Sequence, residues 1–285
     1  MRRLDRGWRR ALAFAAALFV LSAGVAMAGG AVWARDFESP RVTVLGAGNR
    51  LSVLVTAGPS RLLIATGDDP GAFGNALADA RPPMARRLDV VLLAGRATDL
   101  AVAAEASADS HARYVATIGP LPDSAATDAM GAETLPVIDA PRRIRLSDEV
   151  DVTVEVAVVP GEDADEPPIV AWRAVVRRGA TTVVVLSDGR DAGRFGSLGP
   201  VAAVVLVGEH PAEAVDHVAT GALVVNSDTF EGRELRGDIG TRLNGSMWAV
   251  RVFPGEAVRL EFVDGGLRLP DEVTQAIGPT PASDR

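Results

Sequence analysis

Residues 88–100 read Leu-Asp-Val-Val-Leu-Leu-Ala-Gly-Arg-Ala-Thr-Asp-Leu, and this stretch decides the fold. The short apolar run at 89–93 is typical of a buried strand. Asp99 stands at the start of an alanine-rich segment, where a carboxylate in the N-cap position accepts a hydrogen bond from the first turn of a helix. We therefore expect a strand at 89–93, a short turn, and a helix over 99–110 that Asp99 caps.

β-rich runs lie on both sides of this unit and fall into two groups. The first group ends with the unit itself and comprises residues 42–45, 51–56, 61–66 and 89–93. The second group comprises residues 150–159, 169–177, 181–187 and 201–207. Each group ends in an alternation of strand and helix, with a second helix expected at 211–220. A run as apolar as 201–207 needs cover on both faces, so we predict an α/β fold, a four-layer αββα sandwich over residues 35–270.

The N-terminus carries a basic segment followed by a long apolar run. Residues 1–10 contain five arginines and one aspartate, and residues 11–34 contain no charged side chain. About 20 apolar residues suffice for a helix to span a bilayer, and the positive-inside bias places the basic segment in the cytoplasm. We expect residues 11–34 to form an uncleaved transmembrane helix that holds the domain on the outer face of the cell membrane.

A cleavable signal peptide is the alternative for this segment. Ala26-Met27-Ala28 fits an A-x-A cleavage site, and cleavage there would give a secreted domain. We prefer the anchor because the apolar run continues past that site and exceeds the usual apolar region of about 7–15 residues. At the other end, residues 271–285 are rich in Pro, Thr, Ser and Ala and are expected to be disordered.

Composition limits the chemistry open to the chain. The net charge of −8 repels nucleic acid phosphates, so we expect no general nucleic-acid binding. The chain has three histidines and no cysteine, which excludes thiol catalysis and makes it poor in zinc ligands. The arginine clusters at 81, 86 and 87 and at 142, 143 and 145 could contact an anionic ligand or lipid headgroups, but we interpret them as solvated surface, as exposed arginines generally are.

Residues 88–100 resemble the metallo-β-lactamase superfamily, in which a buried strand ends in T-H-x-H-x-D-H and these side chains hold one or two zinc ions. Gly95, Ala97 and Leu100 fall on the histidines of that motif, and only Asp99 remains. Residues 43–49 are similar to the L-D-V-G-Q-G-D opening of ComEC-type competence proteins. Residues 63–67 are similar to the L-I-D-T-G that follows it, and both stretches have lost their aspartates.

Two later stretches extend this resemblance. Asp188 follows the apolar run 181–187 at the place of a bridging aspartate. Glu209 and His210 follow the run 201–207 at the place of the paired histidines of H-H-G-S. The resemblance thus implies a degenerate metallo-β-lactamase-like domain whose residual metal-ligand candidates are Asp99, Asp188, Glu209 and His210, with no catalytic residue assigned.

Two functions remain open at this point. The first is a membrane-tethered pseudoenzyme that binds no metal and no other cofactor and acts as a binding or assembly scaffold. The second is a hydrolase that cleaves a phosphodiester or similar bond through an altered Asp/His site, with Mg²⁺, Mn²⁺ or Ca²⁺ fitting its oxygen ligands better than zinc. Without a cation, Asp99 and Asp188 should repel each other, so we expect an open, hydrated edge at which alanine substitutions leave stability little changed.

Overall fold

A computed structural model describes residues 39–81, 87–94, 97–109, 111–119, 132–159, 169–226 and 248–269. The basic segment 1–10, the predicted anchor 11–34 and the predicted tail 271–285 lie outside the described residues. Within the described ranges, no helix is both long and apolar enough to cross a membrane. The domain boundaries drawn from the sequence therefore stay predictions.

The first sheet holds the N-terminal strands and the C-terminal hairpin. Its order is β15-β14-β1-β2-β3-β4-β5-β6. The strands are β1 (Arg41–Gly46), β2 (Leu51–Ala57), β3 (Ser60–Ala65), β4 (Arg87–Leu93), β5 (His111–Thr117), β6 (Glu133–Thr134), β14 (Ala257–Val263) and β15 (Gly266–Arg268). β1 pairs antiparallel with β2 and β14, whereas β3, β4 and β5 run parallel to one another. The first residues of β1, β3, β4 and β5 consequently share one end of the sheet, and their last residues share the other.

The second sheet is built from the middle of the chain. Its order is β13-β12-β11-β10-β9-β8-β7. The strands are β7 (Arg142–Arg145), β8 (Val150–Val159), β9 (Ile169–Arg178), β10 (Thr181–Leu186), β11 (Ala203–Leu206), β12 (Ala222–Asn226) and β13 (Trp248–Val252). The strands β7 to β10 are antiparallel to their neighbours, and β10 to β13 are parallel.

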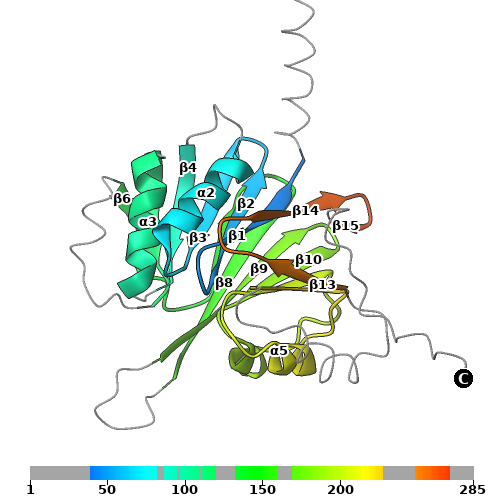
Figure 1. Ribbon diagram of the computed structural model, residues 1–285. Helices are drawn as coiled ribbons and strands as arrows, with labels where there is room; N and C mark the ends of the chain where they lie inside the picture. The colour runs from blue at the N-terminus through cyan, green and yellow to red at the C-terminus, as the bar shows by residue number, and fades with distance from the viewer. Residues whose placement is uncertain are drawn as a thin grey trace, which may run out of the picture. The chain divides into compact units, whose positions relative to one another are not determined.

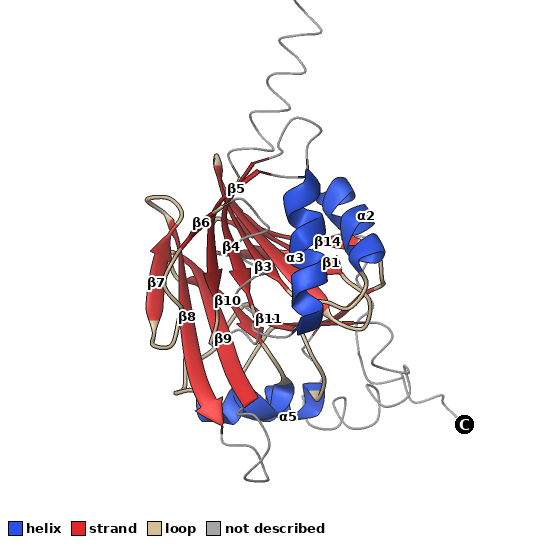
Figure 2. Cartoon of the chain, turned by 90° about the vertical axis from the view of Figure 1, so that its left-hand side faces the viewer, coloured by secondary structure: helices blue, strands red, loops and turns tan. Residues whose placement is uncertain are grey.

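The two sheets pack face to face, with helices on their outer sides (Figures 1 and 2). One apolar cluster, which includes Trp172, fills the space between the sheets. A second lies between the first sheet and the helices α2 (Pro70–Ala80) and α3 (Ala97–Asp109). A third lies between the second sheet and the short helices η1 (Gly189–Arg194) and α5 (Pro211–His217). This arrangement is the predicted four-layer αββα sandwich.

The predicted β-rich runs are confirmed as strands, although the run 201–207 is a strand only over Ala203–Leu206, and each group lies in the sheet expected for it. The predicted helix at 99–110 begins two residues earlier, at Ala97, and the predicted helix at 211–220 ends at His217. The sequence reading missed α2, because Gly71 and Gly74 within it disfavour a helix. Its start signals are nevertheless present, since Asp69 accepts a hydrogen bond from Ala72 N and Pro70 stands at the first position.

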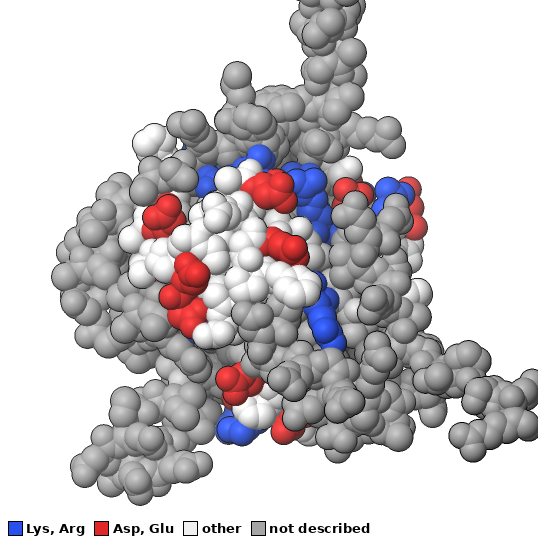
Figure 3. All heavy atoms as spheres, in the orientation of Figure 1, with Lys and Arg blue, Asp and Glu red and all other residues white. Residues whose placement is uncertain are grey.

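Charge is unevenly spread over the helical face of the first sheet. Figure 3 shows acidic side chains scattered over the face that α2 and α3 form, with arginines along its margin.

Candidate functional site

Loops from both sheets meet at one edge of the sandwich. The backbone N–H of Leu51, after the β1–β2 loop, donates to the carbonyl of Val207, after β11, at 3.3 Å. The Nδ2 of Asn226, the last residue of β12, donates to the carbonyl of Gly48 at 2.6 Å. The carboxyl ends of β3, β4, β10 and β11 therefore lie at the edge where the sequence-predicted site residues were expected.

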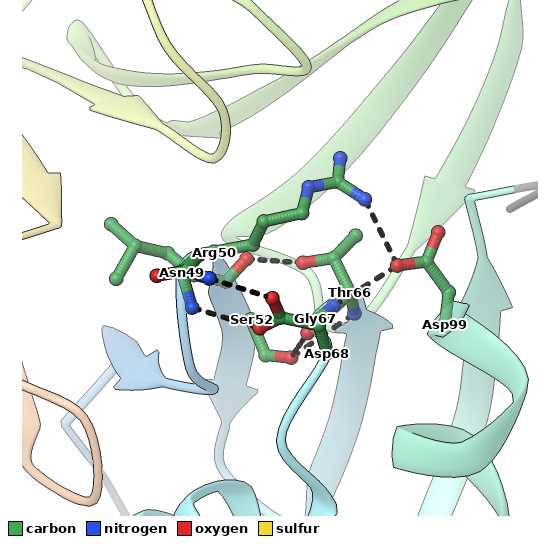
Figure 4. A network of polar contacts seen from close by, with 8 residues as sticks. Asn49, Arg50, Ser52, Thr66, Gly67, Asp68 and Asp99 are labelled. Carbon is green, nitrogen blue, oxygen red and sulfur yellow. Dashed lines mark hydrogen bonds and ion pairs between the residues drawn. The ribbon is translucent and has the colours of Figure 1, made fainter. Parts of the chain in front are cut away.

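Asp99 lies inside the first turn of α3 and is fully buried. Its Oδ1 accepts hydrogen bonds from Nη1 of Arg50 and from the backbone N–H of Gly67, both at 3.0 Å (Figure 4). Arg50 belongs to the β1–β2 loop and is itself largely buried. One carboxylate thus joins three segments of the chain, and its negative charge is balanced by a guanidinium.

Further polar contacts hold the loops around this ion pair in place. Asp68 accepts from the backbone N–H of Asn49 at 2.8 Å and from its Nδ2 at 3.0 Å (Figure 4). Beneath them, the hydroxyls of Ser52 and Thr66 bond to backbone groups of the neighbouring strand, Ser52 to Thr66 and Thr66 to Leu51. The β1–β2 loop is therefore fixed on both of its flanks, which holds Arg50 against Asp99.

Asp188 and His210 form a second pair, on the loops that follow β10 and β11. Oδ1 of Asp188 lies 3.0 Å from Nδ1 of His210, and the two side chains are 25% and 23% exposed. Asp188 also caps η1 through Arg190 N and accepts from Glu209 N. His210 has a φ of 67°, the left-handed region that a histidine seldom adopts.

The loops here pack so closely that Gly189 has no space for a side chain. A Cβ at Gly189 would lie 1.6 Å from the carbonyl oxygen of His210. The backbone N–H of Gly189 donates to the carbonyl of Glu209 at 2.8 Å, which ties the two loops together. Among the four residues named from the sequence, the structure thus brings the side chains of Asp188 and His210 together, and only the backbone N–H of Glu209 joins them, while Asp99 binds Arg50.

Neither a protein-family model nor the sequence of a curated protein matches this chain. Solved structures do match. The diiron β-hydroxylase CmlA from Streptomyces venezuelae aligns with a TM-score of 0.51 at 14% identity, over 79% of this chain and 54% of CmlA. The metallo-β-lactamase fold protein YhfI from Bacillus subtilis aligns with a TM-score of 0.50 at 14% identity, over 79% of this chain and 100% of YhfI. The chain has the metallo-β-lactamase fold. It spans about half the length of CmlA.

The residues that the structure describes at this edge of the metallo-β-lactamase fold do not form a set that fits a metal ion. In the described part of the chain, no group of three or more His, Asp and Glu side chains is placed to share one cation. Three protein ligands are the usual minimum for a catalytic zinc. A cation bound at Asp99 would also lie beside the guanidinium of Arg50 and be repelled by it.

Two expectations from the sequence are wrong at Asp99. Asp99 does not stand at the N-cap of α3, because the helix begins at Ala97. The edge is also not open and hydrated there, since Asp99 is fully buried and paired with Arg50. The expectation that alanine at Asp99 leaves stability little changed rested on an open edge, so it no longer holds. The sequence reading missed Arg50 and Asp68, and no local pattern marks either residue.

Proposed function

We propose that this domain works without a bound metal, as a binding or assembly scaffold held at the outer face of the cell membrane by residues 11–34. The buried ion pair between Arg50 and Asp99 carries the proposal. Arginine stays protonated in proteins, so its charge is a permanent substitute for a cation at that carboxylate. The ion pair fixes the loops at this edge without a metal ion, and a fold can serve binding after its original chemistry is lost.

The support for the membrane tether comes from the sequence. The five arginines before the apolar run and its length favour an uncleaved anchor with the domain outside. Protease added to spheroplasts should then degrade the domain, with a cytoplasmic marker protein as the protected control. A full-length chain protected in the cytosol would contradict the tether.

Metal content of the purified full-length chain tests the metal-free part of the proposal. After incubation with Zn²⁺, Mn²⁺ or Ca²⁺ and removal of free ion, we expect far less than one metal per chain and an unchanged Tm. The variant Asp188→Asn/His210→Gln should give the same result. Stoichiometric metal that disappears in this variant, but not in the surface control Asp148→Asn, would overturn the proposal.

Such a result would favour a metal-dependent hydrolase. One observation supports this alternative. Asp188 and His210 are in direct contact and partly exposed, with Glu209 next to them. A divalent ion there would supply an activated water for attack on a phosphodiester. Cleavage of a bis(4-nitrophenyl) phosphate probe, lost in Asp188→Asn/His210→Gln, would establish this alternative. Complementation of a deletion strain by that variant would instead support the scaffold.

A further inference from the structure

Arginines gather at the end of the first sheet that lies opposite to the candidate site. Because β1, β3, β4 and β5 run in the same direction, their first residues meet at this end. The helix α2 contributes a further arginine at its C-terminus. We call these residues the arginine end: Arg41, Arg61, Arg81, Arg87 and Arg113.

The sheet register and the hydrogen bonds place the arginines on the strands of this end. Arg41 and Arg61 flank the same residue of β2, Thr56, in the sheet register. Nη1 of Arg61 donates to the carbonyl of Arg87 at 3.3 Å. Arg113 lies on β5, next to β4, and its guanidinium stacks 4.9 Å from the ring centroid of Tyr114.

Two carboxylates lie among these arginines. Asp89 accepts from the backbone N–H of Arg61 at 2.9 Å and lies 3.5 Å from Nε of Arg87. Glu261 faces Arg41 across the register, and it lies 3.5 Å from a further arginine, Arg268. The pKa of Arg61 is lowered, mainly by burial; Asp89 acts to raise it and Arg41 to lower it. The side chains of Arg87 and Arg113 are exposed to solvent.

The chain enters the domain at this same end. Pro40, whose carbonyl accepts from Phe262 N, directly precedes Arg41. Only five residues, 35–39, separate the apolar run 11–34 from Pro40. Extended chain covers about 3.3–3.6 Å per residue, so Pro40 stays within roughly 20 Å of the last apolar residue. If the run is anchored, this short connection keeps Arg41, at the arginine end, within reach of the lipid headgroups.

We propose that the arginine end docks on an anionic lipid surface and so turns the candidate site edge away from the membrane. This inference rests on the proposed tether. Basic side chains next to an anionic bilayer are attracted to it, and the attraction falls off within a screening length. The exposed arginines, their place at the end of the sheet where the chain enters, and the short linker all favour the same partner. This partner is the headgroup layer of the bilayer that holds the anchor.

The absence of native cysteine allows a direct test on the full-length chain. A fluorophore is placed on Pro59→Cys, in the β2–β3 turn of the arginine end, or on Glu209→Cys at the opposite edge. Each chain is reconstituted into phosphatidylcholine vesicles with or without phosphatidylglycerol, containing a nitroxide-headgroup quencher. We expect phosphatidylglycerol to increase quenching at position 59 and not at 209. About 1 M NaCl, where the screening length is about 3 Å, should reverse the increase.

Matched charge variants test whether the arginine end causes the increase in quenching. Arg87→Gln/Arg113→Gln should lower the docked-to-free ratio about thirtyfold. Arg142→Gln/Arg143→Gln removes the same charge from the exposed strand β7, including one surface ion pair, and should leave quenching unchanged. A chain that fails to float with either vesicle overturns the tether and this inference with it. A chain that floats with both, but responds neither to phosphatidylglycerol nor to the 87/113 variant, overturns the docking surface alone.

Discussion

Arg50 and Asp99 are 49 positions apart in the sequence, and their side chains meet at 3.0 Å with Asp99 fully buried. The pair connects the β1–β2 loop to the start of α3, and Asp99 connects both to Gly67 at the end of β3. A buried ion pair adds little net stability over apolar residues, whereas the loss of one partner is costly. The pair therefore fixes the arrangement of the loops at this edge, and each partner depends on the other.

Asp99→Asn should destabilise the protein strongly. The asparagine keeps an oxygen that accepts from Gly67 N, but it leaves the guanidinium of Arg50 buried without its counter-charge. The expected loss in the free energy of unfolding is about 3–5 kcal/mol, measured by chemical denaturation of the full-length chain. Asp148→Asn is the control, because Asp148 is 97% exposed in its pair with Arg145 and should cost no more than about 1 kcal/mol. Equal losses in the two variants would contradict the role given to burial.

The double variant Arg50→Met/Asp99→Asn should be more stable than either single variant. Arg50→Met alone leaves a buried carboxylate, and Asp99→Asn alone leaves a buried guanidinium, whereas the double variant buries neither charge. The coupling energy from a double-mutant cycle should be at least about 2 kcal/mol. Additive losses would show that the two side chains are not a buried ion pair in solution.

The sequence predicts the layers of this fold better than its site. The apolar composition of runs such as 89–93 and 201–207 itself predicts buried strands. Their assignment to the two sheets therefore follows from local sequence pattern. The helix α2 was missed, although Phe73, Ala76, Leu77 and Ala80 have the spacing of a buried helical face. The pair between Arg50 and Asp99 has no such local signal, because it depends on the three-dimensional approach of a loop to a distant helix.

Gly189→Ala should be far more disruptive than Gly196→Ala. The added methyl at Gly189 would overlap the carbonyl oxygen of His210, and relief requires the two loops after β10 and β11 to separate. Overpacking of this kind costs about 1–3 kcal/mol or more. Gly196 has open space around its Cβ position, so alanine there should change the free energy of unfolding by less than about 0.5 kcal/mol. Equal stabilities by thermal unfolding would contradict the close approach.

His210→Gly should be more stable than His210→Ala. Both variants remove the imidazole and its contact with Asp188, so the difference between them isolates the backbone. At a φ of 67°, an L-residue bears a cost of about 1–2 kcal/mol that glycine does not. Denaturation of the two variants should therefore differ by about 1 kcal/mol in favour of glycine. If alanine were the more stable variant, the left-handed backbone at position 210 would not persist in solution. The position of the imidazole beside Asp188 would then require an explanation other than this backbone conformation.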